Sequence, residues 1–169
     1  MALRAIRINN DPILKRPCRE VPQVDDRVRQ LLDDMLETLH ATANGAAIAA
    51  PQVGILKRAV VVDVREGLIE PVNPEIVSAE GEQSGPEGCL SVPGRSGIVV
   101  RPERVTVRAQ NAHGEPIEVT GEGFLARAFC HEIDHLDGIL YVDKMVREIF
   151  PDEEEEDGEA ETDGEEEGE

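Results

Sequence analysis

The sequence predicts an α+β fold, in which small antiparallel or mixed sheets pack around a central helix. Three observations support this class. An amphipathic helical pattern follows residue 25, several short β-branched runs lie between residues 58 and 121, and a second helical segment starts near Gly123. Helix, strands and helix, in that order, are typical of folds whose helices pack on antiparallel sheets.

The N-terminal helix is expected to begin at Asp25. Residues 11–22 contain three prolines, which favour an extended, turn-rich lead-in. Between residues 28 and 39 the apolar residues recur at steps of three and four, the spacing of a helix with one buried face. Asn44-Gly45 favours a stop. The polar face of this helix is predicted to carry Arg27, Asp33, Asp34 and Glu37.

The middle of the chain is rich in predicted strands. Residues 45–54 indicate a loop, because Gly, Ala and Pro dominate them. Beyond this loop, β-branched or alternating runs are bounded by turn residues such as Pro71 and Gly97, a pattern that favours strands. The expected strands are residues 58–65, 72–80, 96–102, 104–110 and 116–121.

The second helix is expected to run from near Gly123 through LARAFCHEIDHLD and to end at Gly138 in a left-handed cap. Residues 1–151 are predicted to form one domain, since a chain of this length buries a single sizeable core. Residues 152–169 hold 13 of the 36 acidic residues and no Lys or Arg. These like charges repel one another, so the segment is predicted to be a disordered acidic tail.

The formal net charge of -19 is concentrated in that tail, and the rest of the chain has 23 acidic against 17 basic residues. No basic surface is expected, so nucleic acid is not the predicted substrate. No segment resembles a signal peptide or approaches the length of a membrane span, so we expect a cytoplasmic protein without membrane contact. The three cysteines favour metal binding or burial over a disulfide framework.

Two histidines four residues apart, His131 and His135, indicate a metal site. On a helix they project from one face about one turn apart, so both imidazoles can reach a single ion. Glu132 beside them fits the His-Glu-x-x-His arrangement, in which the carboxylate moves a proton and does not bind the metal. The alternative is a solvated helix face without a metal.

A catalytic site of this kind needs a third protein ligand. His40 and His113 lack supporting context, whereas Cys89 lies in a loop that Gly88 opens to close approach and that flanking prolines, Pro86 and Pro93, stiffen. A thiolate would favour iron or zinc over magnesium or calcium. The alternative for Cys89 is a small buried hydrophobic residue.

The other two cysteines receive no site role. Cys130 adjoins His131, but neighbours on a helix point about 100° apart, so it is expected to pack in the core. Cys18 has no partner in view.

Three segments, taken together, resemble the signature motifs of peptide deformylase. They are GAAIAAPQVG at 45–54, EGCLS at 87–91 and HEIDHLDG at 131–138, and the opening MALRAIRINNDPILKRP is also similar to the start of that family. The resemblance spans residues 1 to about 148. It implies removal of the formyl group from the N-terminal formylmethionine of newly made polypeptides.

The resemblance also implies the ligands and the catalytic groups. Cys89, His131 and His135 would hold Fe²⁺, which Ni²⁺, Co²⁺ or Zn²⁺ can replace. Glu132 would be the general acid and base. The side-chain amide of Gln52 and the backbone N–H of Leu90 would face the formyl oxygen.

By the same resemblance, the methionine side chain enters an apolar pocket beside the metal. Its expected residues are Gly45, Ala46, Leu125, Ala128, His131 and the aliphatic stem of Arg127. Glu87 is expected to pair with Arg101 and to support the loop.

The implied partners are formylated nascent peptides. Ribosome binding is left open, except through the acidic tail, which RNA would repel. A monomer is expected.

One departure from the family pattern motivates an alternative function. Ala47 stands where the family usually has a second glycine, so its methyl group could strain the loop or narrow the cleft. A non-catalytic protein that binds formyl peptides or metal is therefore an alternative. A zincin-type peptidase, with a remote His or Glu as third ligand, is another.

Overall fold

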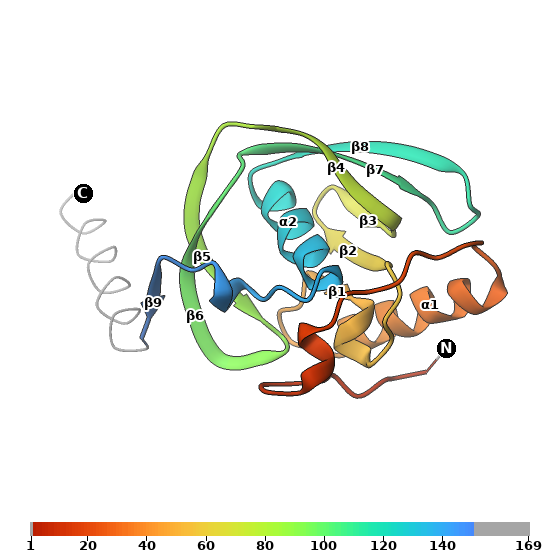
Figure 1. The fold of residues 1–169 in the computed structure, drawn as a ribbon, viewed down its shortest axis with the longest axis horizontal. Helices are drawn as coiled ribbons and strands as arrows, with labels where there is room; N and C mark the ends of the chain where they lie inside the picture. Colours follow the sequence, from red (N-terminus) through yellow and green to blue (C-terminus); the bar gives the residue numbers. More distant parts are fainter. Residues whose placement is uncertain (1, 151–169) are drawn as a thin grey trace, which may run out of the picture.

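The computed structural model describes residues 2–150 and places in them two α-helices and three small antiparallel sheets (Figure 1). The predicted α+β class is confirmed. The boundary at residue 151 and the acidic tail lie outside the described residues. The helices are α1 (Asp26–His40) and α2 (Phe124–Leu136), and the strands are β1 (Ala47–Ala49), β2 (Val60–Val64), β3 (Gly67–Ile69), β4 (Val72–Glu80), β5 (Gln83–Cys89), β6 (Val92–Arg101), β7 (Arg104–Gln110), β8 (Pro116–Glu122) and β9 (Arg147–Ile149).

Helix α1 begins as expected but differs in its polar face. The Asp25 side chain caps it by accepting a hydrogen bond from Val28 N at 3.1 Å, and the helix ends at His40, before the expected stop. Asp34, predicted to be on the solvated face, is only 4% exposed. The N-terminal segment covers it, because Asp34 accepts hydrogen bonds from Ala2 N at 2.8 Å and from Arg4 Nε at 3.0 Å.

The strands pair in the orders β1-β2-β3, β4-β7-β8 and β5-β6-β9. The five predicted strands are present, and β6 starts earlier than expected, at Val92. The predicted loop 45–54 instead contains β1 and a 3₁₀ turn, Ala50–Val53. Strands β1, β3 and β9 have three residues each, too short for an alternating pattern to be recognised in the sequence.

Cys89 was expected in a loop stiffened by prolines, but it ends a strand of a hairpin. Leu90 and Ser91 form the turn between β5 and β6, and Cys89 pairs with Val92. Pro86 is tolerated because β5 lies at a sheet edge, where a strand can do without one N–H donor. Pro93 lies next to the turn, beyond the part of β6 that pairs with β9.

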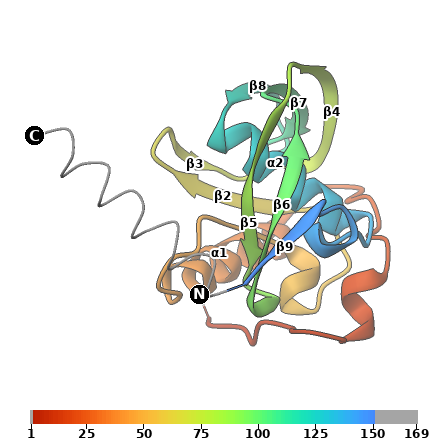
Figure 2. The ribbon, with the colours of Figure 1, turned by 90° about the vertical axis from the view of Figure 1, so that its left-hand side faces the viewer.

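Helix α2 lies at the centre and contacts strands from all three sheets, among them β1, β6 and β8. Figure 2 shows β5 and β6 running side by side across it, with β9 along the edge of β6. The predicted left-handed cap is present: Gly138 has φ 75°, and a Cβ atom there would lie 2.5 Å from Lys15 O. None of the helices in residues 2–150 is both long and apolar enough to cross a membrane.

Candidate active site

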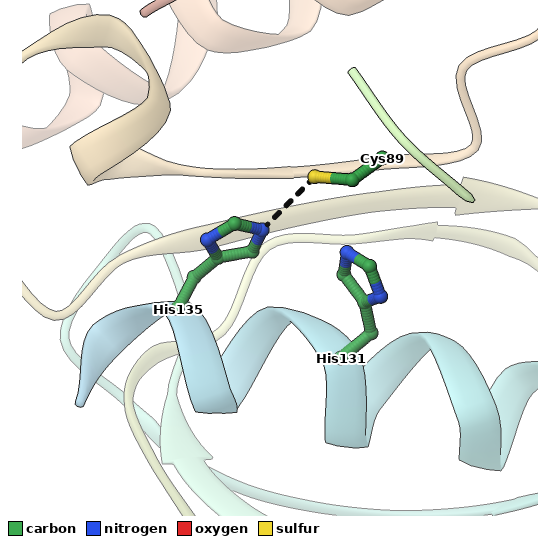
Figure 3. Close-up of side chains that lie close together, drawn as sticks. All are labelled: Cys89, His131 and His135. Carbon is green, nitrogen blue, oxygen red and sulfur yellow. Dashed lines mark hydrogen bonds between the residues drawn. The ribbon is translucent and has the colours of Figure 1, made fainter. Parts of the chain in front are cut away.

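The structure brings Cys89, His131 and His135 together at the meeting of β5 and α2 (Figure 3). Their donor atoms all lie within 4.8 Å of one another. Cys89 Sγ is 3.3 Å from His135 Nε2, and the two imidazoles rise from successive turns of α2 towards the sulfur. The two histidines therefore share one helix face, as the sequence spacing predicts, and the hairpin brings the Cys89 sulfur to them.

These residues fit a divalent transition-metal ion. One sulfur and two imidazole nitrogens form a donor set that suits iron or zinc and leaves a coordination position for water. The buried Oε2 atom of Glu132 has no hydrogen-bond partner among the described residues. Buried polar atoms normally have one, so this oxygen is available to a water molecule or a substrate group.

Glu87 fixes the orientation of His131. Its carboxylate lies 2.8 Å from His131 Nδ1 and accepts two hydrogen bonds from the Arg101 guanidinium, both at 2.9 Å. Arg127 Nη1 donates a further one at 2.6 Å. Burial alone would raise the pKa of Glu87, but the hydrogen bonds from His131 and Arg101 outweigh it and lower the pKa to about 2. An ionised Glu87 therefore holds the Nδ1 proton, so Nε2 is the nitrogen that a metal can take once it displaces the proton there.

Glu87 and Arg101 belong to a larger ionic network that the sequence did not predict. Asp134, on α2, accepts a hydrogen bond from Arg101 Nη1 at 2.7 Å. The predicted Glu87–Arg101 pair is thus part of a larger buried ionic network that also includes Arg127. The guanidinium of Arg127 was not expected in it. The sequence gives no sign of these ion pairs, because their partners are 33 and 40 residues apart.

Glu132 is almost fully buried, with Oε1 3.9 Å from His131 Nε2. Burial disfavours its charged form and raises its pKa to about 7, although the neighbouring His131 acts in the opposite direction. A carboxyl group with this pKa can both take up and release a proton near neutral pH.

The two histidines differ in their protonation. Burial lowers the pKa of each, but in His131 the hydrogen bonds to Cys89 and Glu87 outweigh burial and raise the pKa to about 10. Burial and the charges of His131 and Arg101 keep the pKa of His135 well below its ordinary value. A metal that binds here must therefore displace a proton from the site.

Gln52 points its amide NH₂ group at the same site. Its Oε1 accepts a hydrogen bond from Ala49 N at 2.9 Å, and its Nε2 donates to Ser91 Oγ at 3.1 Å and lies 3.5 Å from Cys89 Sγ. The side chain is 1% exposed. Ser91 is fully buried and was not a predicted site residue. Its position in the EGCLS motif could have indicated a role at the site. Leu90, in the hairpin turn, lines the adjoining cavity.

A cavity of about 490 Å³ opens beside these residues. The expected Gly45, Ala46, Arg127 and Ala128 line it. Leu125 is not among the lining residues: it is buried in the core and packs against Gly121, where an added Cβ would lie 2.7 Å from Leu125 Cγ.

Phe124 lines the cavity instead and is 61% exposed. Neighbours on a helix point about 100° apart, so Phe124 and Leu125 cannot share a face. The sequence could have indicated Phe124 as a pocket residue. Phe124, Ala128 and His131 are spaced by four and three residues, which places them on one helix face.

Ala47 causes no backbone strain. The non-glycine residues with positive φ among those described are Asn9 and Asn73, so the expected strain at Ala47 is absent; a narrower cleft remains a prediction. Ala47 opens β1, pairs with Val62 and lines the cavity.

The remaining His and Cys residues lie elsewhere. His40 Nε2 contacts Asp63 Oδ2 at 2.5 Å on the surface, and His113 is exposed in the turn before β8. Cys130 packs in the core as predicted. Cys18 is a half-buried free thiol whose pKa is raised to about 11 by burial.

The comparisons with known proteins agree with one another. The polypeptide deformylase family model matches residues 3–149. Peptide deformylase 2 of Clostridium acetobutylicum is 60% identical over 149 residues, which cover 88% of this chain and 99% of that protein. The peptide deformylase of Acetivibrio thermocellus is 58% identical over 153 residues, covering 90% and 89%. The crystal structure of a peptide deformylase from Legionella pneumophila has a TM-score of 0.82 and 44% identity, covering 85% of this chain and 86% of that one. This chain therefore belongs to the peptide deformylase family.

Proposed function

We propose that the protein hydrolyses the N-terminal formyl group of newly made polypeptides, releasing formate and a free amino terminus. The observation that supports this most strongly is the convergence of Cys89, His131 and His135 beside the buried carboxyl group of Glu132, at the wall of an accessible cavity. Family membership gives the reaction, and this geometry provides the groups that such a reaction requires.

Cys89, His131 and His135 would hold the metal, and Fe²⁺ is the proposed ion, with Ni²⁺, Co²⁺ or Zn²⁺ able to replace it. The thiolate favours these metals over magnesium or calcium. When bound, such an ion supplies Lewis acidity that makes water nucleophilic near neutral pH. Glu87 prepares the site by keeping the His131 lone pair on Nε2.

Glu132 carries the proton during hydrolysis. Water adds to the formyl carbon, and Glu132 takes up the proton that this water loses. The C–N bond then breaks, and Glu132 delivers that proton to the departing amine, so the products are the free amine and formic acid, which loses its proton to solvent and leaves as formate. Burial supports this role, because it raises the pKa of Glu132 to about 7.

Gln52 and Leu90 stabilise the negative charge that develops on the formyl oxygen. The Nε2 group of Gln52 is fixed by Ala49 at one end of the amide and by Ser91 at the other. The backbone N–H of Leu90 is the second proposed donor. Removing one donor of this kind typically costs about 2.7 to 4 kcal/mol of transition-state stabilisation.

The cavity is the proposed site for the methionine side chain, between Gly45, Ala46, Ala128 and the stem of Arg127. The Arg127 guanidinium faces Glu87, which leaves the aliphatic part of its side chain to form the wall. Strand β1 is at a sheet edge, so the peptide backbone can pair along residues 45–47 and 87–89. Backbone hydrogen bonds do not depend on the side chains of the peptide, so the site can bind many nascent sequences. We propose that the monomer is the active form.

Formate release from formyl-Met-Ala under anaerobic conditions tests the function. The Fe²⁺-loaded protein should release one formate per peptide, and Cys89→Ala should lose both turnover and bound metal. A fully metal-loaded wild-type protein without turnover would favour the non-catalytic alternative. Unchanged metal affinity in Cys89→Ala would favour a zincin-type site with a remote ligand.

A further inference from the structure

Three aromatic rings contact one another in a row at the proposed metal site: Tyr141, His131 and His135. The ring of Tyr141 lies nearly parallel to that of His131, with centroids 5.9 Å apart and an interplanar angle of 21°. The His131 ring in turn meets that of His135 edge to face, at 5.1 Å and 61°. Tyr141 begins a short 3₁₀ turn, Tyr141–Asp143, beyond the end of α2.

The two histidines are oriented by different means. His131 Nδ1 has the Glu87 carboxylate at 2.8 Å, which fixes the direction of this ring within its plane. His135 Nδ1 is buried and has no hydrogen-bond partner among residues 2–150. Metal-binding histidines are normally held by a hydrogen bond to the second nitrogen. His135 Nε2 lies 3.3 Å from Cys89 Sγ, and the ring packs edge to face against His131, so this packing restrains the His135 plane where no hydrogen bond to Nδ1 does.

Tyr141 is itself held firmly. It is 1% exposed and packs in a cluster with Leu14, Val92 and Val99, against which Cys89 is also placed. Its carbonyl oxygen accepts hydrogen bonds from Lys144 N at 2.9 Å and from Met145 N at 2.8 Å.

The turn that carries Tyr141 is anchored as well. Asp143 accepts a hydrogen bond from Leu140 N at 2.9 Å and pairs with Lys15 Nζ at 2.8 Å. A ring anchored in this way can restrain its neighbour.

We propose that Tyr141 is a positioning residue that holds the imidazole planes of His131 and, through it, His135 ready for the metal. The proposal rests on the metal site put forward above. The phenol oxygen of Tyr141 is buried without a hydrogen-bond partner among the described residues. The face of the ring, and not its hydroxyl group, therefore performs this role.

Two variants separate the ring from the hydroxyl group, and a third controls for stability. Tyr141→Phe keeps the stacked face, and Tyr141→Leu removes it. Leu14→Ala makes a cavity in the same cluster and leaves the Tyr141 ring in place. Each protein is loaded with Co²⁺, and the visible absorption spectrum of the ion and its rate of release to a chelator are measured, alongside the melting temperature.

Tyr141→Phe should retain the spectrum and release rate of the wild type, and Tyr141→Leu should show a changed spectrum and release Co²⁺ at least about tenfold faster. Leu14→Ala should lower the melting temperature but leave the spectrum and release rate unchanged. If Tyr141→Leu and Leu14→Ala release cobalt equally fast, or if Tyr141→Phe behaves like Tyr141→Leu, the inference is overturned while the function stands. A wild-type protein that binds no Co²⁺ would overturn the metal site and the inference with it.

Discussion

At the scale of single residues, the site depends on charges and donors that neighbouring groups hold in place. Glu87 is ionised because His131 and Arg101 donate hydrogen bonds to it, whereas burial raises the pKa of Glu132 to about 7. Two carboxyl groups close to one histidine thus have pKa values pushed in opposite directions. We propose that the first orients a metal ligand and that the second moves a proton.

Glu132→Gln should lower kcat by about 10² to 10⁴ because the amide cannot accept a proton. The substitution preserves the shape of the side chain, and Glu132 is not among the metal donors, so metal content should remain at one ion per chain. Steady-state formate release with elemental analysis of the same sample checks both. Loss of the metal together with activity would contradict the assigned role.

Ser91→Ala removes the acceptor of Gln52 Nε2, so the amide is held less firmly, by Ala49 N at its other end. We expect a fall in kcat of about tenfold with little change in KM, since the donor acts on the transition state. Gln52→Ala should cost more, about 10² to 10³. Steady-state kinetics on one formyl peptide give kcat and KM for both variants. If Ser91→Ala lowers kcat as much as Gln52→Ala does, Ser91 does more than position the amide.

Phe124 should affect binding and not chemistry. Its exposed ring lies in the cavity wall, so Phe124→Ala should raise KM for formyl-Met peptides severalfold and leave kcat nearly unchanged. Leu68→Ala is the matched control, because Leu68 is also exposed but does not line this cavity. Equal KM values for the two variants would exclude Phe124 from the substrate site.

At the scale of elements, the sequence predicted those that are long and periodic. Helix α1, helix α2 and the strands from β2 to β8 with clear β-branched patterns were found in nearly the expected places. Strand β5 was missed because Gly85, Pro86 and Gly88 interrupt it, and a proline at a sheet edge leaves no signal of pairing.

Errors at this scale arose where tertiary contacts decide the outcome. Leu125 was placed in the pocket, but its position on α2 turns it into the core. Asp34 was placed on the solvated face of α1, because nothing in the local pattern shows that the N-terminal segment crosses it. The three proposed metal ligands do lie together in the structure; two of them are fixed by helical spacing, and all three belong to the signature motifs.

The N-terminal segment should depend on the charge of Asp34. Burial alone would raise the pKa of Asp34, but hydrogen bonds from Gln30, Ala2 and Arg4 lower it below the ordinary 3.8. A depressed folded-state pKa gives stability that is complete above the ordinary value and is lost as the pH falls below it.

Asp34→Asn should therefore destabilise the protein by about 1 to 2 kcal/mol near pH 7, and the difference from wild type should shrink at lower pH. Chemical denaturation at pH 7 and near pH 3 measures this. Asp33→Asn, at the exposed neighbouring position, should have little effect at either pH. A difference that does not change with pH would show that the charge of Asp34 is not what secures the segment.

At the scale of the whole molecule, the site joins segments that are remote in the chain. A hairpin from one sheet supplies the sulfur, the central helix supplies two imidazoles, and the 3₁₀ turn after β1 supplies the amide. A metal bound by the hairpin and the helix would link them and stabilise the folded state by mass action, about 2.7 kcal/mol at a hundred times its Kd.

The central claim is that one sulfur and two imidazole nitrogens bind a single catalytic ion. Anomalous diffraction at the iron edge, from crystals grown without oxygen, tests this most directly. A single peak bonded to Cys89 Sγ, His131 Nε2 and His135 Nε2 is the predicted result. No peak in fully protected crystals, or a peak with Cys89 turned away, would contradict it.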